Sequence, residues 1–136
     1  MLAFINIFYP TTAIQLLVLA LLAILFLQSG LDKVFNYKGN LEWLTGHFEK
    51  SPLKGTVGLL MPVITLLEVA AGLMCTIGIG ALILYDDLDH GYMGCLLSAI
   101  SLIALFFGQR LAQQYEGAEN LTTYFLIALL GIYLLG

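Results

Sequence analysis

Charge is the scarcest property of this sequence. Only 10% of its 136 residues are Asp, Glu, Lys or Arg, whereas a soluble globular domain carries about 25%. Hydrophobic residues make up 60%, and a chain of this length could not bury so much apolar surface in water, because small domains bury the smallest fraction of theirs. The five basic residues form no stripe, so the sequence shows no nucleic-acid footprint. Lipid is therefore the expected solvent.

Cysteine and histidine are also scarce. Cys75 and Cys95 form no C-x-x-C motif, so a thiol–disulfide relay is not expected, and small buried hydrophobes are the better interpretation. His47 and His90 are expected on opposite sides of the membrane, which leaves no ligand set for haem or zinc. We predict no metal and no intrinsic cofactor. With no catalytic constellation visible, redox chemistry would need a carried-in cofactor such as a quinone.

Long apolar runs are what the sequence has instead. They cover residues 11–31, 55–85, 91–108 and 121–136, and a membrane helix needs roughly 20 mostly apolar residues. We predict an all-α membrane protein, a single domain over 1–136 built as a four-transmembrane-helix bundle. The expected helices cover about 11–34, 56–85, 88–112 and 118–136, with a short amphipathic interfacial helix at about 40–50.

The loop before the second long run has the pattern of that short helix. Leu41, Leu44 and Phe48 fall at helical spacing with Trp43 beside them, and Asn40 can cap the start. One interpretation is that Trp43 and the neighbouring lysines anchor the helix at the membrane surface. The alternative is that the helix forms a lid over a site between the long helices.

The basic residues predict the orientation. All five lie in or beside the first and third loops: Lys33, Lys38, Lys50, Lys54 and Arg110. The second loop has three aspartates and no basic residue. The positive-inside rule then places loops one and three in the cytoplasm and both termini outside, in a multi-pass protein of the inner membrane.

Glu68 is the one Asp, Glu, Lys or Arg residue within the second run, and a carboxylate in a membrane suggests a function by default. Gly72, Thr76 and Gly80 follow it at steps of four, a small-residue row that another helix can approach closely. Glu68 is therefore expected to face protein. It is either half of a buried pair with Lys33 or Arg110 that holds the bundle together, or a carboxylate that handles protons or binds a ligand.

Several polar residues are expected at the same level as Glu68, towards the cytoplasmic end. This polar layer draws on three of the four long helices, and its predicted binding residues are Glu68, Lys33, Asp32, Gln28, Gln109 and Arg110.

Three segments of the chain resemble the DoxX-like family of small four-helix membrane proteins. They are "FLQSGLDKVF" (26–35), "LLEVAAGLMCTIGIG" (66–80) and "FFGQRLAQQYEGA" (106–118). The resemblance rests on Gly30 and Lys33 closing the first helix, and on Glu68 before Gly72 and Gly78 in the second. The third segment is similar to a pattern of one branch of the family, matched here by Gly108, Gln109, Arg110, Ala112, Tyr115, Gly117 and Ala118.

The small size, the lack of a catalytic constellation and the small-residue row after Glu68 predict a small accessory subunit of an inner-membrane complex. The resemblance adds a link to quinone or redox chemistry, since the name-giving members resemble subunits of a thiosulfate:quinone oxidoreductase, but a shared fold does not by itself transfer an activity. Expected partners are the lipid bilayer and other membrane-protein subunits or a second copy, and no nucleic acid. The alternatives are a quinone- or small-molecule-binding protein that uses the polar layer, and a membrane-protein assembly factor. A small multidrug exchanger is disfavoured because its membrane glutamate belongs in the first helix.

Overall fold

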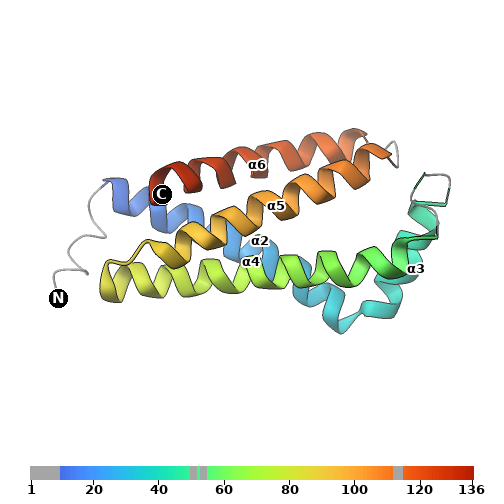
Figure 1. The fold of residues 1–136 in the computed structure, drawn as a ribbon, viewed down its shortest axis with the longest axis horizontal. Helices are drawn as coiled ribbons and strands as arrows, with labels where there is room; N and C mark the ends of the chain where they lie inside the picture. Colours follow the sequence, from blue (N-terminus) through green and yellow to red (C-terminus); the bar gives the residue numbers. More distant parts are fainter. Residues whose placement is uncertain (1–9, 50–51, 53–54, 112–114) are drawn as a thin grey trace.

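The computed structural model describes residues 10–49, 52, 55–111 and 115–136. Within these ranges the chain is helical and contains no strand (Figure 1). In chain order the helices are α2 (Pro10–Phe35), α3 (Tyr37–His47), α4 (Val57–Tyr85), α5 (Asp89–Leu111) and α6 (Tyr115–Leu135).

Four of these helices, α2, α4, α5 and α6, are long and apolar enough to cross a membrane. The predicted all-α, four-helix membrane architecture is therefore confirmed. The fifth helix, α3, has 11 residues and begins at Tyr37, upstream of the expected start at Asn40. Asn40 does not cap α3, because the helix begins at Tyr37 and Asn40 lies within its first turn. The side-chain nitrogen of Asn40 donates instead to Asp32 and to the backbone oxygen of Asn36.

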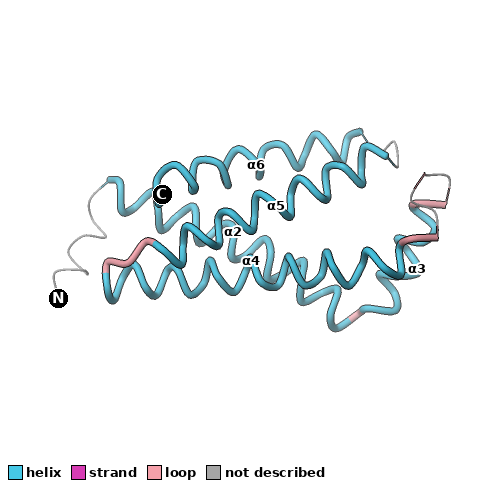
Figure 2. The backbone as a smooth tube through the Cα atoms, viewed as in Figure 1, coloured by secondary structure: helices cyan, strands magenta, loops and turns pink. Residues whose placement is uncertain are grey.

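The long helices pack side by side (Figure 1, Figure 2). Helix α4 contacts both α2 and α5, and α6 packs on α5 and α2. Helix α3 lies at one end of the bundle, together with the end of α2, the start of α4, the end of α5 and the start of α6. The α4–α5 turn lies at the other end, together with the start of α2 and the end of α6. The helix ends that border the predicted loops one and three thus lie opposite the α4–α5 turn, while residues 50–51, 53–54 and 112–114 of those loops lie outside the described residues.

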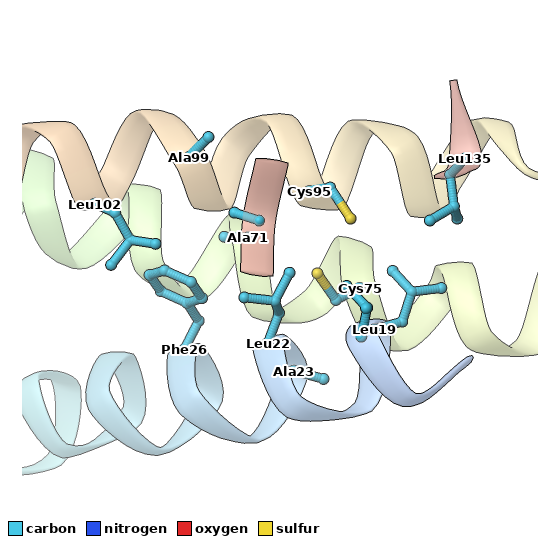
Figure 3. Packing of buried hydrophobic residues seen from close by; sticks show 12 residues of the cluster. Leu19, Leu22, Ala23, Phe26, Ala71, Cys75, Cys95, Ala99, Leu102 and Leu135 are labelled. Carbon is cyan, nitrogen blue, oxygen red and sulfur yellow. The ribbon is translucent and has the colours of Figure 1, made fainter. Parts of the chain in front are cut away.

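The interior of the bundle is a narrow apolar core drawn from all four long helices (Figure 3). Phe26, Leu22 and Leu19 of α2 are almost fully buried, and the thiols of Cys75 and Cys95 lie among them. The interpretation of both cysteines as small buried hydrophobes is confirmed. Large apolar side chains also cover the outside of the bundle, as expected for helices solvated by lipid.

The small-residue row on α4 is covered only at its start. A Cβ atom added at Gly72 would lie 2.8 Å from the backbone nitrogen of Leu27, so α2 approaches α4 closely there. Thr76 is exposed, and a Cβ atom at Gly80 would meet no heavy atom within 4 Å. The rest of the row therefore faces outward, and within the described part of the chain no neighbouring helix occupies it.

Candidate functional site: a cavity beside a buried ion pair

Glu68 lies inside the bundle, with none of its surface exposed. Its Oε2 atom accepts a hydrogen bond from Ser29 Oγ at 2.7 Å and another from Lys33 Nζ at 3.1 Å. Lys33 Nζ also donates to Ser29 Oγ at 3.0 Å, so the three side chains form a closed set of hydrogen bonds. The predicted burial of Glu68 against Lys33 is confirmed.

The local sequence explains why this set forms. Ser29 and Lys33 are four residues apart on α2 and share a face of the helix. Between them Gly30 lets α2 approach α4, since a Cβ atom there would lie 2.8 Å from Val69 Cγ2 and 3.1 Å from the backbone nitrogen of Val69. Glycine is thus required for the close approach that brings both donors within reach of Glu68.

The second carboxylate oxygen of Glu68 is the unusual part of the site. Among the described residues, Oε1 is the one buried side-chain oxygen or nitrogen with no hydrogen-bond partner. A buried acceptor left unsatisfied costs about 1–3 kcal/mol, and more when it is charged. The bundle therefore holds Glu68 by one oxygen only, an arrangement that a purely structural ion pair does not need.

Next to this ion pair is a cavity of about 380 Å³ between α3, α4 and α5. Its polar lining residues are Lys33, Asn40, His47 and Gln109. Most of the wall is apolar, with side chains that include Leu44, Phe48, Met61, Ile64, Leu105 and Phe107. Lys33 thus belongs both to the cavity wall and to the Glu68 ion pair, and it connects the two features.

Helix α3 forms one wall of the cavity and is fastened at two points. His47 Nε2 and Gln109 Oε1 of α5 are 3.2 Å apart, a hydrogen bond in which the imidazole donates to the amide oxygen. Nearer the other end of α3, Asn40 Nδ2 donates to Asp32 Oδ2 at 3.2 Å. Trp43 stacks on the His47 ring, with centroids 4.8 Å apart. None of the residues of α3 is buried, and the two hydrogen bonds connect it to α2 and α5.

The six predicted site residues separate into two groups. Glu68 and Lys33 form the ion pair, and Gln109 lines the cavity. Asp32 is exposed and serves to hold α3 through Asn40.

Gln28 and Arg110 are not brought into the site. Both are exposed, and neither lines the cavity. Each is adjacent in sequence to a site residue, Ser29 or Gln109, and a step of one residue turns about 100° around a helix, so its side chain points elsewhere.

Sequence reasoning missed His47 and Asn40 as site residues. From the sequence, His47 is weighed only as a metal or haem ligand. The available signal was its position between Leu44 and Phe48 on the apolar face of the amphipathic helix. The structure places His47 at the end of α3 and His90 at the start of α5, at opposite ends of the bundle (Figure 1).

Comparisons with family models, with curated proteins and with solved structures found no match to this chain. The resemblance to the DoxX-like family stays a prediction that rests on the three quoted segments. The chemistry of the site is therefore argued from its own side chains. They offer an apolar space, one ammonium group backed by a buried carboxylate, and several neutral hydrogen-bonding groups.

Proposed function

We propose that this multi-pass membrane protein binds a small lipid-soluble molecule in the cavity between α3, α4 and α5. The observation that supports this is the cavity itself, a mainly apolar space with one partly buried cation, Lys33, on its wall. Ligand sites are typically about 300–1,000 Å³, mainly apolar, and fitted with a few polar groups that fix orientation. This cavity has those properties.

The ligand is expected to have an apolar body and a head group that accepts hydrogen bonds. The body would lie against side chains such as Met61, Ile64 and Leu105. The head group would lie near Lys33, which can donate three hydrogen bonds and uses two of them on Ser29 and Glu68. In this proposal α3 lies at the membrane interface and covers the cavity, which joins the two roles considered for it.

A quinone is the first candidate ligand. Its carbonyl oxygens are neutral acceptors suited to Lys33 and to the amide of Gln109, and its ring and tail are apolar. The support for a quinone in particular comes from the resemblance to the DoxX-like family. The cavity supports the broader class of lipid-soluble molecules with a hydrogen-bond-accepting head group.

Trp43 provides the test. It is the single tryptophan of the chain and lines the cavity, so a bound quinone should quench its fluorescence. Protein in nanodiscs is titrated with a short-chain quinone. We expect saturable quenching that Ala104→Leu weakens at least tenfold, because Ala104 lines the cavity and the larger side chain fills it.

The matched control is Ala13→Leu, which enlarges a partly buried alanine near the start of α2, at the opposite end of the bundle. It should leave the titration unchanged. Quenching that does not saturate, or that is equal in both variants, would show that the quinone reaches Trp43 from the bilayer and not from the cavity.

A role as an accessory subunit of a DoxX-like inner-membrane complex is a second proposal, and the open part of the α4 row favours it. Thr76 is exposed, and the space beside Gly80 is free of other atoms of the described chain. Small residues on a lipid-facing helix let a partner helix approach closely.

Mass determination after extraction in mild detergents should find a complex, and Gly80→Leu should reduce it to a monomer. A monomer in every detergent would count against this role, including its assembly-factor form.

A further inference from the structure

The polar end of the cavity has a charge arrangement that determines what must change when a charged head group binds. Lys33 is the one lysine, arginine, aspartate or glutamate among the residues described as lining the cavity. Its charge is already neutralised by Glu68, whose carboxylate lies behind it and is completely buried. The pair carries no net charge, and any charged ligand at Lys33 would change that.

We propose that the cavity takes an amphipathic monoanion, and that Glu68 gains one proton when the anion engages Lys33. This inference rests on the proposed binding function and names its ligand class. In the step, the ion pair between Lys33 and Glu68 opens and Lys33 pairs with the anionic head group. The Glu68 carboxylate takes a proton from water and becomes a neutral acid. The buried layer has zero net charge before and after.

The geometry of Glu68 supports this exchange. The Lys33 ammonium and the Ser29 hydroxyl both bind Oε2, while Oε1 is buried without a partner among the described residues. If Lys33 turned to a ligand and Glu68 stayed ionised, a buried carboxylate would lose its counter-ion and keep one hydrogen bond. Burying a charge without a partner is far less favourable than neutralising it by a proton. Proton uptake is therefore the lower-energy outcome.

A neutral ligand requires no such change, which separates an anion from a quinone. A quinone carbonyl could accept the third hydrogen bond of Lys33 while the ion pair stays closed. An anion attracts the ammonium group itself and competes directly with Glu68. The prediction specific to the anion is that binding becomes tighter as the proton concentration rises.

Other titratable or charged groups near the site have to be separated from Glu68. On the elements packed around it these are Lys33 and Asp32 on α2, His47 on α3 and Arg110 at the end of α5. Histidine is the residue type whose charge most often changes near neutral pH, so the contribution of His47 is measured with His47→Gln.

The experiment uses octanesulfonate, which stays charged at every pH used, and octanol as the neutral probe with the same chain. Binding to the full chain in phosphatidylcholine nanodiscs is followed by Trp43 fluorescence between about pH 6 and pH 8. We expect the affinity for octanesulfonate to fall about tenfold per pH unit in the wild type, the slope for one proton taken up per ligand. Octanol should bind with no pH dependence.

The variants identify the proton acceptor. Glu68→Gln imitates the protonated acid, so octanesulfonate should bind at every pH with the slope abolished. His47→Gln should keep the slope. As a measurement that needs no variant, an indicator dye in weakly buffered solution should report about one proton taken up for each octanesulfonate bound by the wild type.

Two failures lead to different conclusions. If octanol binds and octanesulfonate does not bind, the inference is wrong and the proposed binding function stands. The same conclusion follows if octanesulfonate binds without pH dependence and without proton uptake. If neither probe nor the quinone binds, the proposed function itself is wrong. If Glu68→Gln keeps the pH dependence of octanesulfonate binding, another group takes up the proton and the assignment of that proton to Glu68 is wrong.

Discussion

Glu68 shows how one residue can organise this protein. A charged side chain at the centre of a membrane costs roughly 2.5–3.5 kcal/mol even on the permissive insertion scale. The fold lowers that cost with Lys33 and Ser29, both of which donate to the same carboxylate oxygen. It nevertheless leaves Oε1 without a partner among the described residues. Apolar residues in place of the whole Lys33–Glu68 pair would often serve stability as well or better, which is why we assign Glu68 a role in binding.

Removing Lys33 should be more harmful than removing the whole pair. Lys33→Met leaves the fully buried Glu68 without its counter-ion, and breaking a buried pair in this way typically costs about 3–5 kcal/mol. We expect a loss of unfolding free energy at the low end of that range, because protonation of Glu68 relieves part of it. Adding Glu68→Gln to Lys33→Met should recover part of the loss. Unfolding in a detergent series, followed by circular dichroism, measures both.

A double variant that is less stable than Lys33→Met would contradict this account. It would mean that Glu68 contributes through contacts other than the ion pair.

The sequence contained enough information to predict the pair but not the membership of the whole polar layer. Glu68 and Lys33 could be matched because both lie near the same end of their helices, and a lysine side chain is long enough to reach inward. Gln28 and Arg110 belong to the predicted layer because they lie near the level of Glu68 along the bundle. Level along a helix does not determine the direction around it, and a single residue step separates exposed Gln28 from Ser29 at the ion pair.

At the scale of elements, the contact between α2 and α4 depends on Gly30. Gly30→Ala should force the helices apart, because the new Cβ atom would lie 2.8 Å from Val69 Cγ2 and 3.1 Å from the backbone nitrogen of Val69. We expect a loss of about 1–3 kcal/mol, the usual cost of overpacking. We also expect weaker octanesulfonate binding as Lys33 is displaced.

Gly80→Ala is the matched control for Gly30→Ala. Its Cβ atom would meet nothing within 4 Å, so it should be neutral or stabilising by up to about 1 kcal/mol, the helix preference of alanine over glycine. Thermal unfolding of the two variants side by side decides the matter. Equal effects would show that Gly30 acts through helix propensity and not through the contact with Val69.

Helix α3 is held over the cavity by a contact that can be removed singly. Gln109→Leu removes the acceptor of the His47 hydrogen bond while keeping a side chain of similar size. A hydrogen bond of this kind contributes about 0.5–1.5 kcal/mol, so amide hydrogen exchange in α3 should accelerate about two- to tenfold. Exchange in α4 and α5 should stay unchanged.

Gln28→Leu makes the same chemical change at an exposed position outside the cavity lining. It should leave exchange in α3 as it is in the wild type. If Gln109→Leu behaves in the same way, the position of α3 is set by Asn40 and the apolar contacts, and His47 is not a fastening point.

At the scale of the whole molecule, the fold was more predictable than the cavity. Four apolar runs of membrane length predict four long helices, because lipid offers no hydrogen-bond partners and a helix pairs its backbone N–H and C=O groups within itself. A cavity is a gap between elements, and its shape depends on how α3, α4 and α5 are placed relative to one another. Leu44 and Phe48 could be assigned to an apolar face from their spacing. The sequence could not predict that this face would point towards α4 and α5, because a helix lying on a membrane surface has the same pattern.

The orientation of the bundle in the membrane is the last prediction. The end with α3 carries Lys33, Lys38 and Arg110, while the opposite end carries the aspartates of the α4–α5 turn (Figure 1). Lys and Arg near helix ends favour the cytoplasmic side, so α3 and the mouth of the cavity should face the cytoplasm. Glu42→Cys and Asp89→Cys place thiols on exposed residues at the two ends, and the native Cys75 and Cys95 are fully buried, so the wild type controls for background labelling. In intact cells a membrane-impermeant maleimide should label Asp89→Cys alone, with Glu42→Cys labelled only after the cells are opened. The reverse pattern would place the cavity on the outer side, and the proton taken up by Glu68 would then come from outside the cell.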